Sequence, residues 1–242
     1  MIRTQRAVLV GSVAAVTLGA WLWLVRASVA PHHRHSGHDF WAFVSVVIMW
    51  QAMMVAMMTP TALGWLFTFA ELSGRDREAR RAYGPVAAFA AGYFAVWMGY
   101  SLLAAVLQTA LQRAGFLQAG GRLPASAGGA ILIAAGLLYF TPLSRACLSH
   151  CRNPLTYFLA RWDNAPRGGF GIGLTHGAYC VGCCWAVMIT AFAMGVMNML
   201  WMALLTVLMC VEKLAPHGDR IGAVAAAGMT IWGAALLFWV II

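Results

Sequence analysis

The chain has 242 residues, of which 62% are hydrophobic and only 10% carry a charged side chain, and its formal net charge is +9. Soluble domains contain about 25% charged residues, so this composition excludes an ordinary soluble domain. It predicts an all-α, polytopic transmembrane helix bundle in a lipid bilayer, with residues 1–242 forming a single integral membrane domain. The basic residues lie between apolar runs, where they meet anionic lipid, and this placement argues against nucleic acid as a partner.

The apolar runs predict about seven membrane spans. They lie at residues 7–25, 40–69, 83–111, 125–142, 170–197, 200–211 and 221–242. The first run could also be a signal peptide, because Ser28-Val29-Ala30 resembles a cleavage site. Signal peptides have apolar regions of about 7–15 residues, which favours a retained span. The run at 200–211 is short for a hydrocarbon core of about 30 Å, and Pro60 is expected to kink or end the second helix.

A loop with four histidines follows the first run, at His32, His33, His35 and His38. Short histidine-rich tracts can collect metal ions. The alternative is a solvated loop whose histidines only titrate.

The second run contains an unusual methionine stretch, M-W-Q-A-M-M-V-A-M-M, at residues 49–58. On a helix, Met53 and Met57 form one row, and Met54 and Met58 form the adjacent row. Methionine commonly fills gaps in protein cores, but five methionines in ten residues exceed that use. The thioethers therefore become candidate ligands for a soft metal ion.

Soft ligands are densest between residues 175 and 188, T-H-G-A-Y-C-V-G-C-C-W-A-V-M. His176, Cys180, Cys184 and Met188 recur every four residues, which places them in one stripe of a helix with Cys183 beside it. Thiolate, imidazole and thioether together favour Cu(I), with zinc as the second choice. The alternative is that these cysteines are ordinary buried thiols that pack as small apolar groups.

A third group, Cys147 and Cys151, lies in the polar connection between the fourth and fifth runs, with His150 beside it. By depth along their helices, the methionine and cysteine stretches overlap between the midplane and the cytoplasmic half of the bilayer. We therefore expect these two stretches to face each other and hold the metal, which would leave through Cys147 and Cys151. The full candidate ligand set is Cys180, Cys183, Cys184, His176, Met188, Met53, Met54, Met57, Met58, Cys147 and Cys151.

The loops orient the chain in the membrane. Twelve of the 16 Lys and Arg residues fall in loops on one side of the predicted spans, and four fall on the other. The positive-inside rule then places the N-terminus in the cytoplasm and the C-terminus in the periplasm of a bacterial inner membrane. The histidine loop would face the periplasm. Glu212 and Lys213 would lie at a helix end, either as an ion pair at the interface or with a role in ion passage.

Four segments carry a resemblance to a known family. They are MWQAMMVAMMTP (49–60), CLSHCRNP (147–154), HGAYCVGCCWAVM (176–188), and GVMNMLWMA (195–203) followed by Glu212-Lys213. They resemble a bacterial family of predicted metal-binding integral membrane proteins, a domain of unknown function with an H-G-x-Y-C-x-G-C-C-W motif. The resemblance covers most of the chain after the first run and implies that metal binding is to be expected.

Three functions fit these patterns. The first is a Cu(I)-binding membrane protein that transports copper or delivers it to a metalloenzyme, with a copper-dependent enzyme or a periplasmic copper carrier as partner. The second is a membrane thiol–disulfide oxidoreductase that uses Cys180 and Cys183. The third is an accessory subunit of a larger membrane complex. The sequence has no nucleotide-binding signature, and it favours a binding protein over an enzyme.

Overall fold

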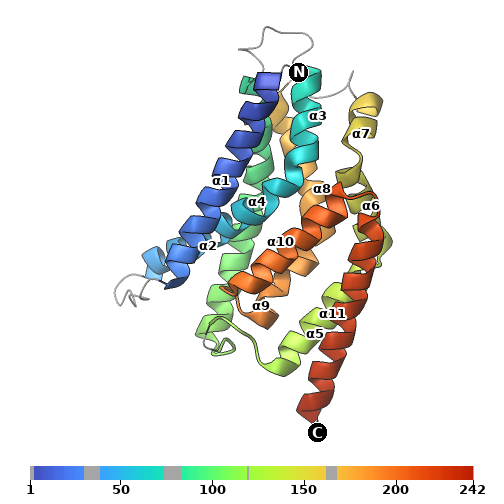
Figure 1. Ribbon diagram of the computed structural model, residues 1–242. Coiled ribbons are helices and arrows are strands. Elements are labelled where there is room, and N and C mark those ends of the chain that lie inside the picture. Colours follow the sequence, from blue (N-terminus) through green and yellow to red (C-terminus); the bar gives the residue numbers. More distant parts are fainter. Residues whose placement is uncertain (1–2, 30–38, 74–82, 119, 162–167, 242) are drawn as a thin grey trace.

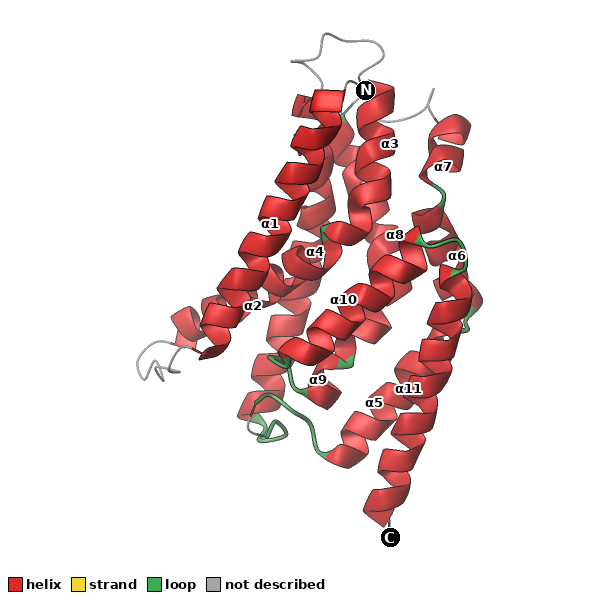
Figure 2. Ribbon diagram, viewed as in Figure 1, coloured by secondary structure: helices red, strands yellow, loops and turns green. Residues whose placement is uncertain are grey.

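The computed structural model describes residues 3–29, 39–73, 83–118, 120–161 and 168–241. Within these ranges the chain forms helices joined by turns, without a strand (Figure 2), so the all-α prediction is confirmed. The helices are α1 (Arg3–Val29), α2 (Asp39–Met58), the 3₁₀ turn η1 (Pro60–Ala62), α3 (Leu63–Ser73), α4 (Tyr83–Arg113), α5 (Ala125–Tyr139), α6 (Pro142–Arg152), α7 (Pro154–Arg161), α8 (Gly169–Ile189), α9 (Ala191–Met194), α10 (Met199–Leu214) and α11 (Gly218–Ile241).

The predicted count of seven spans is not confirmed. In the described part of the chain, five helices are long and apolar enough to cross a membrane, or six if α5 and α6, bent by 65°, form one broken span. The run predicted at 200–211 is α10, whose 16 residues extend about 24 Å at 1.5 Å per residue. The run at 125–142 is α5, which has 15 residues. Both fall short of a hydrocarbon core of about 30 Å.

Pro60 ends the second helix, as predicted. The predicted span 40–69 consists of α2, the η1 turn that begins at Pro60, and α3. Proline cannot donate a backbone hydrogen bond, so it frees carbonyls in the preceding turn. The Thr61 hydroxyl donates to the Met58 carbonyl at 2.9 Å at this break, whereas the Thr59 hydroxyl donates to the Val55 carbonyl, which also accepts from the Thr59 amide.

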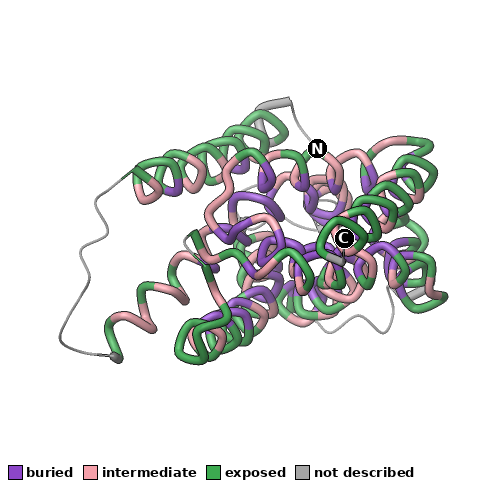
Figure 3. Tube along the Cα trace, turned by 90° about the horizontal axis from the view of Figure 1, so that it is seen from below, coloured by how far each residue is buried: buried purple, intermediate pink, exposed green. Residues whose placement is uncertain are grey.

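The long helices α1, α4 and α11 run along the length of the molecule, α10 crosses it obliquely, and the described ends of the chain lie at opposite ends (Figure 1). Buried residues gather in the interior of the bundle, and exposed ones follow its outer faces (Figure 3). Many outer side chains are large and apolar, including Leu103 at 72% exposed and Trp239 at 81% exposed. Such a surface is unfavourable in water and fits hydrocarbon. Helix α8 is the most buried of the candidate spans.

Helices α4 and α8 approach each other unusually closely because glycines face across the contact. A Cβ atom on Gly173 of α8 would lie 2.0 Å from the Phe89 carbonyl oxygen of α4, and one on Gly92 of α4 would lie 2.1 Å from the Phe170 carbonyl oxygen. Small residues at one face let helix backbones pack closely in membranes. This packing fixes the register of α8, which carries the cysteines, against α4.

We expect Gly173→Ala to destabilise the bundle by about 1–3 kcal/mol, the usual range for overpacking. The added methyl group would overlap the Phe89 carbonyl, so α8 would have to move. Thermal unfolding of the detergent-solubilised protein measures the effect. Gly99→Ala, on α4 with open space around its Cα, is the matched control and should be neutral or stabilising, since alanine favours helix. Equal melting temperatures for the two variants would contradict the close-packing account.

Candidate metal centre

Thiols from two helices meet in the core of the bundle. Cys180 and Cys184 of α8 and Cys151 of α6 are buried, at 0%, 2% and 5% exposed, whereas Cys183 is half-buried. The Cys151 and Cys183 sulfur atoms lie 4.0 Å apart. All of these cysteines are free thiols. The structure thus brings Cys151 to the cysteine stretch of α8, rather than leaving it on a separate cytoplasmic exit.

Helix α6 docks on α8 because of its sharp bend and a glycine. The chain turns by 65° between α5 and α6, and the Thr141 side chain caps the new helix by accepting from the Ser144 amide. Cys147 then lies over Gly182, where an added Cβ would be 2.8 Å from the Cys147 sulfur. From the other side, the Trp65 indole of α3 donates to the Cys151 carbonyl at 2.9 Å. The absence of a side chain at Gly182 makes room for the docked helix.

Cys180 is the centre of the thiol cluster, and sequence reasoning missed its strongest partner. The Lys213 ammonium of α10 donates to the Cys180 sulfur at 3.0 Å, and the Tyr93 hydroxyl of α4 lies 3.1 Å from the same sulfur. Lys213 was expected at the membrane interface, but the residue is buried, with 7% of its surface exposed. The one hint in the sequence that Lys213 is special was that it is the single lysine among 16 basic residues. A buried ammonium next to a thiol favours the thiolate, which is the form that binds metal.

The remaining thiols of α8 are turned toward the backbone. The Cys183 and Cys184 thiols both donate to the Cys180 carbonyl, at 3.1 Å and 2.8 Å. Among the described residues, no three His, Cys, Asp or Glu side chains are already arranged to hold a metal ion. Rotation about χ1 breaks these weak bonds and redirects the sulfur atoms. The thiols are therefore close enough to bind an ion after side-chain rotation, but they do not form a preorganised metal site.

The methionines of α2 lie in the same core as the cysteines, but α4 connects the two helices. Met53, Met54, Met57 and Met58 are at most 1% exposed, and they belong to the cluster that includes Cys180, Cys184 and Met188. Helix α4 packs against both α2 and α8. Met58 is linked to the thiol cluster through Tyr93, because its carbonyl accepts from the Tyr93 hydroxyl at 3.4 Å. The other methionines line the core farther along α2.

His176 lies among aromatic rings one turn before Cys180. Its ring stacks on Trp65 at 4.1 Å and on Tyr93 at 5.3 Å between centroids. The side chain is 2% exposed, and its Nδ1 atom is buried without a hydrogen-bond partner in the described structure. A buried polar atom left unpaired costs about 1–3 kcal/mol. Such an atom beside Cys180 fits a latent metal ligand, because neutral imidazole binds copper.

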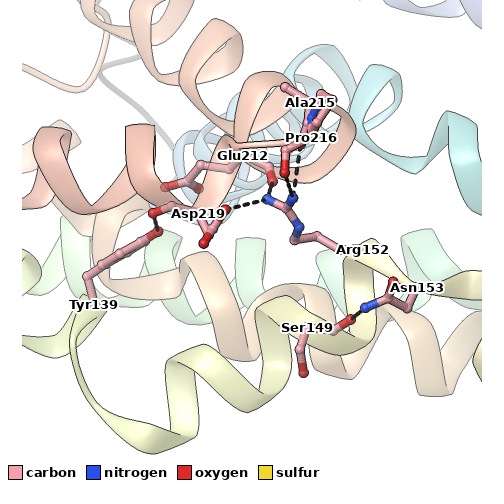
Figure 4. A network of polar contacts seen from close by, with 8 residues as sticks. All are labelled: Tyr139, Ser149, Arg152, Asn153, Glu212, Ala215, Pro216 and Asp219. Atoms are coloured by element: carbon pink, nitrogen blue, oxygen red, sulfur yellow. Dashed lines mark hydrogen bonds and ion pairs between the residues drawn. The ribbon is translucent and has the colours of Figure 1, made fainter.

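Arg152 and its partners hold the end of α10 that carries Lys213. Its guanidinium donates to the carbonyls of Glu212, Ala215 and Pro216 at 2.6–2.9 Å, and it lies 3.7 Å from Asp219 (Figure 4). Burial raises the pKa of Glu212 to about 7, while the neighbouring Lys213 opposes that rise. These contacts tie α6 to the turn between α10 and α11. They therefore fix the position of Lys213 relative to α6 and its thiols.

The predicted histidine loop with His32, His33, His35 and His38 lies outside the described residues. The expected collection of metal at that loop therefore stays a prediction.

A comparison with protein families finds a match over most of the chain. The model of a family described as PpoB2, copper chaperone, covers residues 47–236. This range includes the methionine stretch, the thiols of α6 and α8, and Lys213. No curated protein and no solved structure matches the chain. The family match supports a copper-related function for the chain.

We expect His176→Phe to keep the stability of the bundle and to lower its copper retention. Phenylalanine keeps the aromatic stack and removes a polar atom that has no partner, so the substitution relieves a desolvation cost. Thermal unfolding and copper content of the same purified sample measure both effects. The control is Gln108→Leu, which orphans the Trp50 indole that donates to Gln108 at 2.7 Å, and which should lower stability by about 1 kcal/mol. Unchanged copper retention in His176→Phe would remove His176 from the ligand set.

Proposed function

This chain belongs to the PpoB2 copper chaperone family, and from that membership we propose that it carries Cu(I) within a membrane and delivers it to a copper-dependent enzyme or a periplasmic copper carrier. The observation that carries the proposal is the meeting of thiols from α6 and α8 around Cys180. The Cys151 and Cys183 sulfurs lie 4.0 Å apart, and the buried Lys213 ammonium donates to the Cys180 sulfur. Thiolates and thioethers select Cu(I) over harder ions.

Copper is the cargo here, and the thiols exchange it. In the proposed cycle, Cys180 and Cys151 hold the ion as two thiolates, Cys183 and Cys184 rotate to replace them one at a time during exchange, and His176 and Met58 flank the site. Transfer proceeds by ligand exchange, in which one copper–sulfur bond forms as another breaks, so the ion is never free. Half-buried Cys183 lines a cavity of about 50 Å³ together with Gly182 and Ser144. Cys183 is therefore the thiol at which exchange with a carrier's ligand would begin.

The charge of the site favours a monovalent ion. Two thiolates and one Cu(I) ion together carry one negative charge, which the Lys213 ammonium neutralises. The same pair with a divalent ion such as zinc would leave a net positive charge in the core, and burying an unpaired charge costs several kcal/mol. Lys213, at 3.0 Å from the Cys180 sulfur, therefore supports Cu(I) as cargo with zinc as the weaker competitor.

We place the protein in a bacterial inner membrane with its N-terminus in the cytoplasm and its C-terminus in the periplasm. The distribution of arginines supports this orientation, and the described chain ends, which lie at opposite ends of the molecule, fit termini on opposite sides of the membrane (Figure 1). In this orientation α8 runs from the cytoplasmic side into the bilayer. The thiol cluster then lies within the bundle, where water does not compete for the ion.

A second candidate function has one observation in its favour. Cys151 and Cys183, at 4.0 Å between sulfurs, are close enough to form a disulfide after a small movement. This pair differs from the expected Cys180–Cys183 pair, because the Cys183 thiol donates to the backbone of Cys180. A thiol–disulfide oxidoreductase would cycle this pair. Thiol counting on oxidised and reduced protein separates it from a copper carrier, which functions with all thiols reduced.

Copper loading tests the proposed function. Detergent-purified protein, loaded with Cu(I) under reductant and desalted, should retain copper as measured by elemental mass spectrometry. A Cys180→Ser/Cys183→Ser/Cys184→Ser variant should lose most of it, because the thiolates supply the soft ligands. Cys210→Ser, on α10, is the matched thiol control and should retain copper. Equal retention by the triple variant and the wild type would contradict the thiol site.

Lys213→Met tests the charge argument separately. The variant keeps the side-chain volume and removes the ammonium, so Cu(I) retention should weaken about tenfold or more, since a hydrogen bond to a charged group contributes about 1.5–3 kcal/mol. Zinc retention should fall less or rise. Competition between the protein and a Cu(I)-specific chelator measures the change. Lys213→Arg preserves the charge and should stay closer to the wild type than Lys213→Met; identical affinities for both variants would show that the charge does not matter.

A further inference from the structure

A basic cavity lies between α6 and α11, outside the thiol cluster. Its volume is about 640 Å³, within the range of about 300–1,000 Å³ typical of ligand sites. Arg145, Arg152 and Arg220 line it, against one acidic residue, Asp219. Figure 4 shows one of these arginines, Arg152, which approaches Asp219 and the carbonyls of the α10–α11 turn. The cavity therefore carries an excess of positive charge.

The three arginines differ in how far their charge is already used. Arg152 is engaged with three backbone carbonyls and Asp219. Arg145 and Arg220 are exposed, and neither has a carboxylate partner among the described residues. Two guanidinium groups thus line one opening without a counter-charge. Guanidinium groups bind phosphate through paired, charge-assisted hydrogen bonds.

The rest of the lining is partly apolar, alongside the polar side chains of Tyr139, Ser149 and Asn153. Leu148 and Ala223 line the cavity beside the arginines. On the surrounding surface, Leu143 of α6 is 68% exposed and Val224 of α11 is 74% exposed. A ligand that satisfies both surfaces has an anionic head and an apolar tail.

We propose that this cavity binds the phosphate headgroup of an anionic phospholipid such as phosphatidylglycerol. Arg145 and Arg220 hold the phosphate, and the acyl chains lie over Leu143 and Val224. Basic pockets between membrane helices on the cytoplasmic side recognise such headgroups. The inference rests on the membrane location proposed above, and it is independent of copper.

Native mass spectrometry of the detergent-purified chain, given equal amounts of phosphatidylglycerol and phosphatidylcholine, tests the proposal. The wild type should retain phosphatidylglycerol preferentially. Retention should weaken about fivefold in Arg145→Gln or Arg220→Gln and about thirtyfold in the double variant, since each basic residue near an anionic surface contributes about fivefold. An Arg145→Lys/Arg220→Lys variant keeps both charges and should recover only part of the preference, because lysine supplies the charge without the paired hydrogen bonds.

The controls separate recognition of the lipid headgroup from a general attraction between opposite charges. Arg26→Gln removes an exposed arginine at the end of α1 and should bind lipid as the wild type does. Equal retention of both lipids by the wild type, or an unchanged preference in the double variant, would overturn the proposal. Displacement of the lipid by an equal concentration of inorganic phosphate would also overturn it, because the site would then recognise free phosphate. Alkaline extraction of cell membranes tests the membrane location itself, so its failure is distinguishable from failure of the lipid site.

Discussion

The close approach of α4 and α8 determines most of what this bundle can do. With glycine at position 173, the two backbones come into contact, since a Cβ there would lie 2.0 Å from the Phe89 carbonyl. Tyr93 follows one turn after Phe89 on α4, and the close packing brings its hydroxyl to 3.1 Å from the Cys180 sulfur and its ring over His176. A wider separation would leave the central cysteine without a polar neighbour on that side. Glycine at the helix contact therefore supports both packing and chemistry.

A second constraint is the charge that this arrangement buries. An ammonium in the core is costly unless a partner compensates it, and the Cys180 sulfur is the partner that Lys213 reaches. Arg152 keeps Lys213 close to that partner, because its guanidinium donates to three carbonyls at the end of α10. Arg152 follows Cys151 in the same helix, so one docking of α6 positions both a thiol and the support of the lysine. The thiol cluster and its counter-charge thus depend on the same helix.

Much of this could be predicted from the sequence, and the missing parts have physical reasons. Apolar run length predicted the helical architecture, and four-residue spacing predicted the stripe of His176, Cys180 and Cys184 on one helix. The number of spans was less predictable, because run length does not show that α5 ends at a 65° bend or that α10 has only 16 residues. The meeting of Cys151 with Cys183 depends on that bend and on Gly182, which has no side chain. Spacing within one helix cannot report contacts that another helix supplies.

The resting geometry of the thiols fits a protein that must both hold and release an ion. The Cys183 and Cys184 thiols both donate hydrogen bonds to the Cys180 carbonyl, and such thiol–backbone bonds are weak. Exchanging them for copper therefore costs little, and restoring them after release costs equally little. A rigid, fully formed set of ligands would bind more tightly and release more slowly, because dissociation would have to break every bond from a preorganised site. A copper carrier needs thiols that exchange readily around one fixed centre, and Cys180, held between Lys213 and Tyr93, provides that centre.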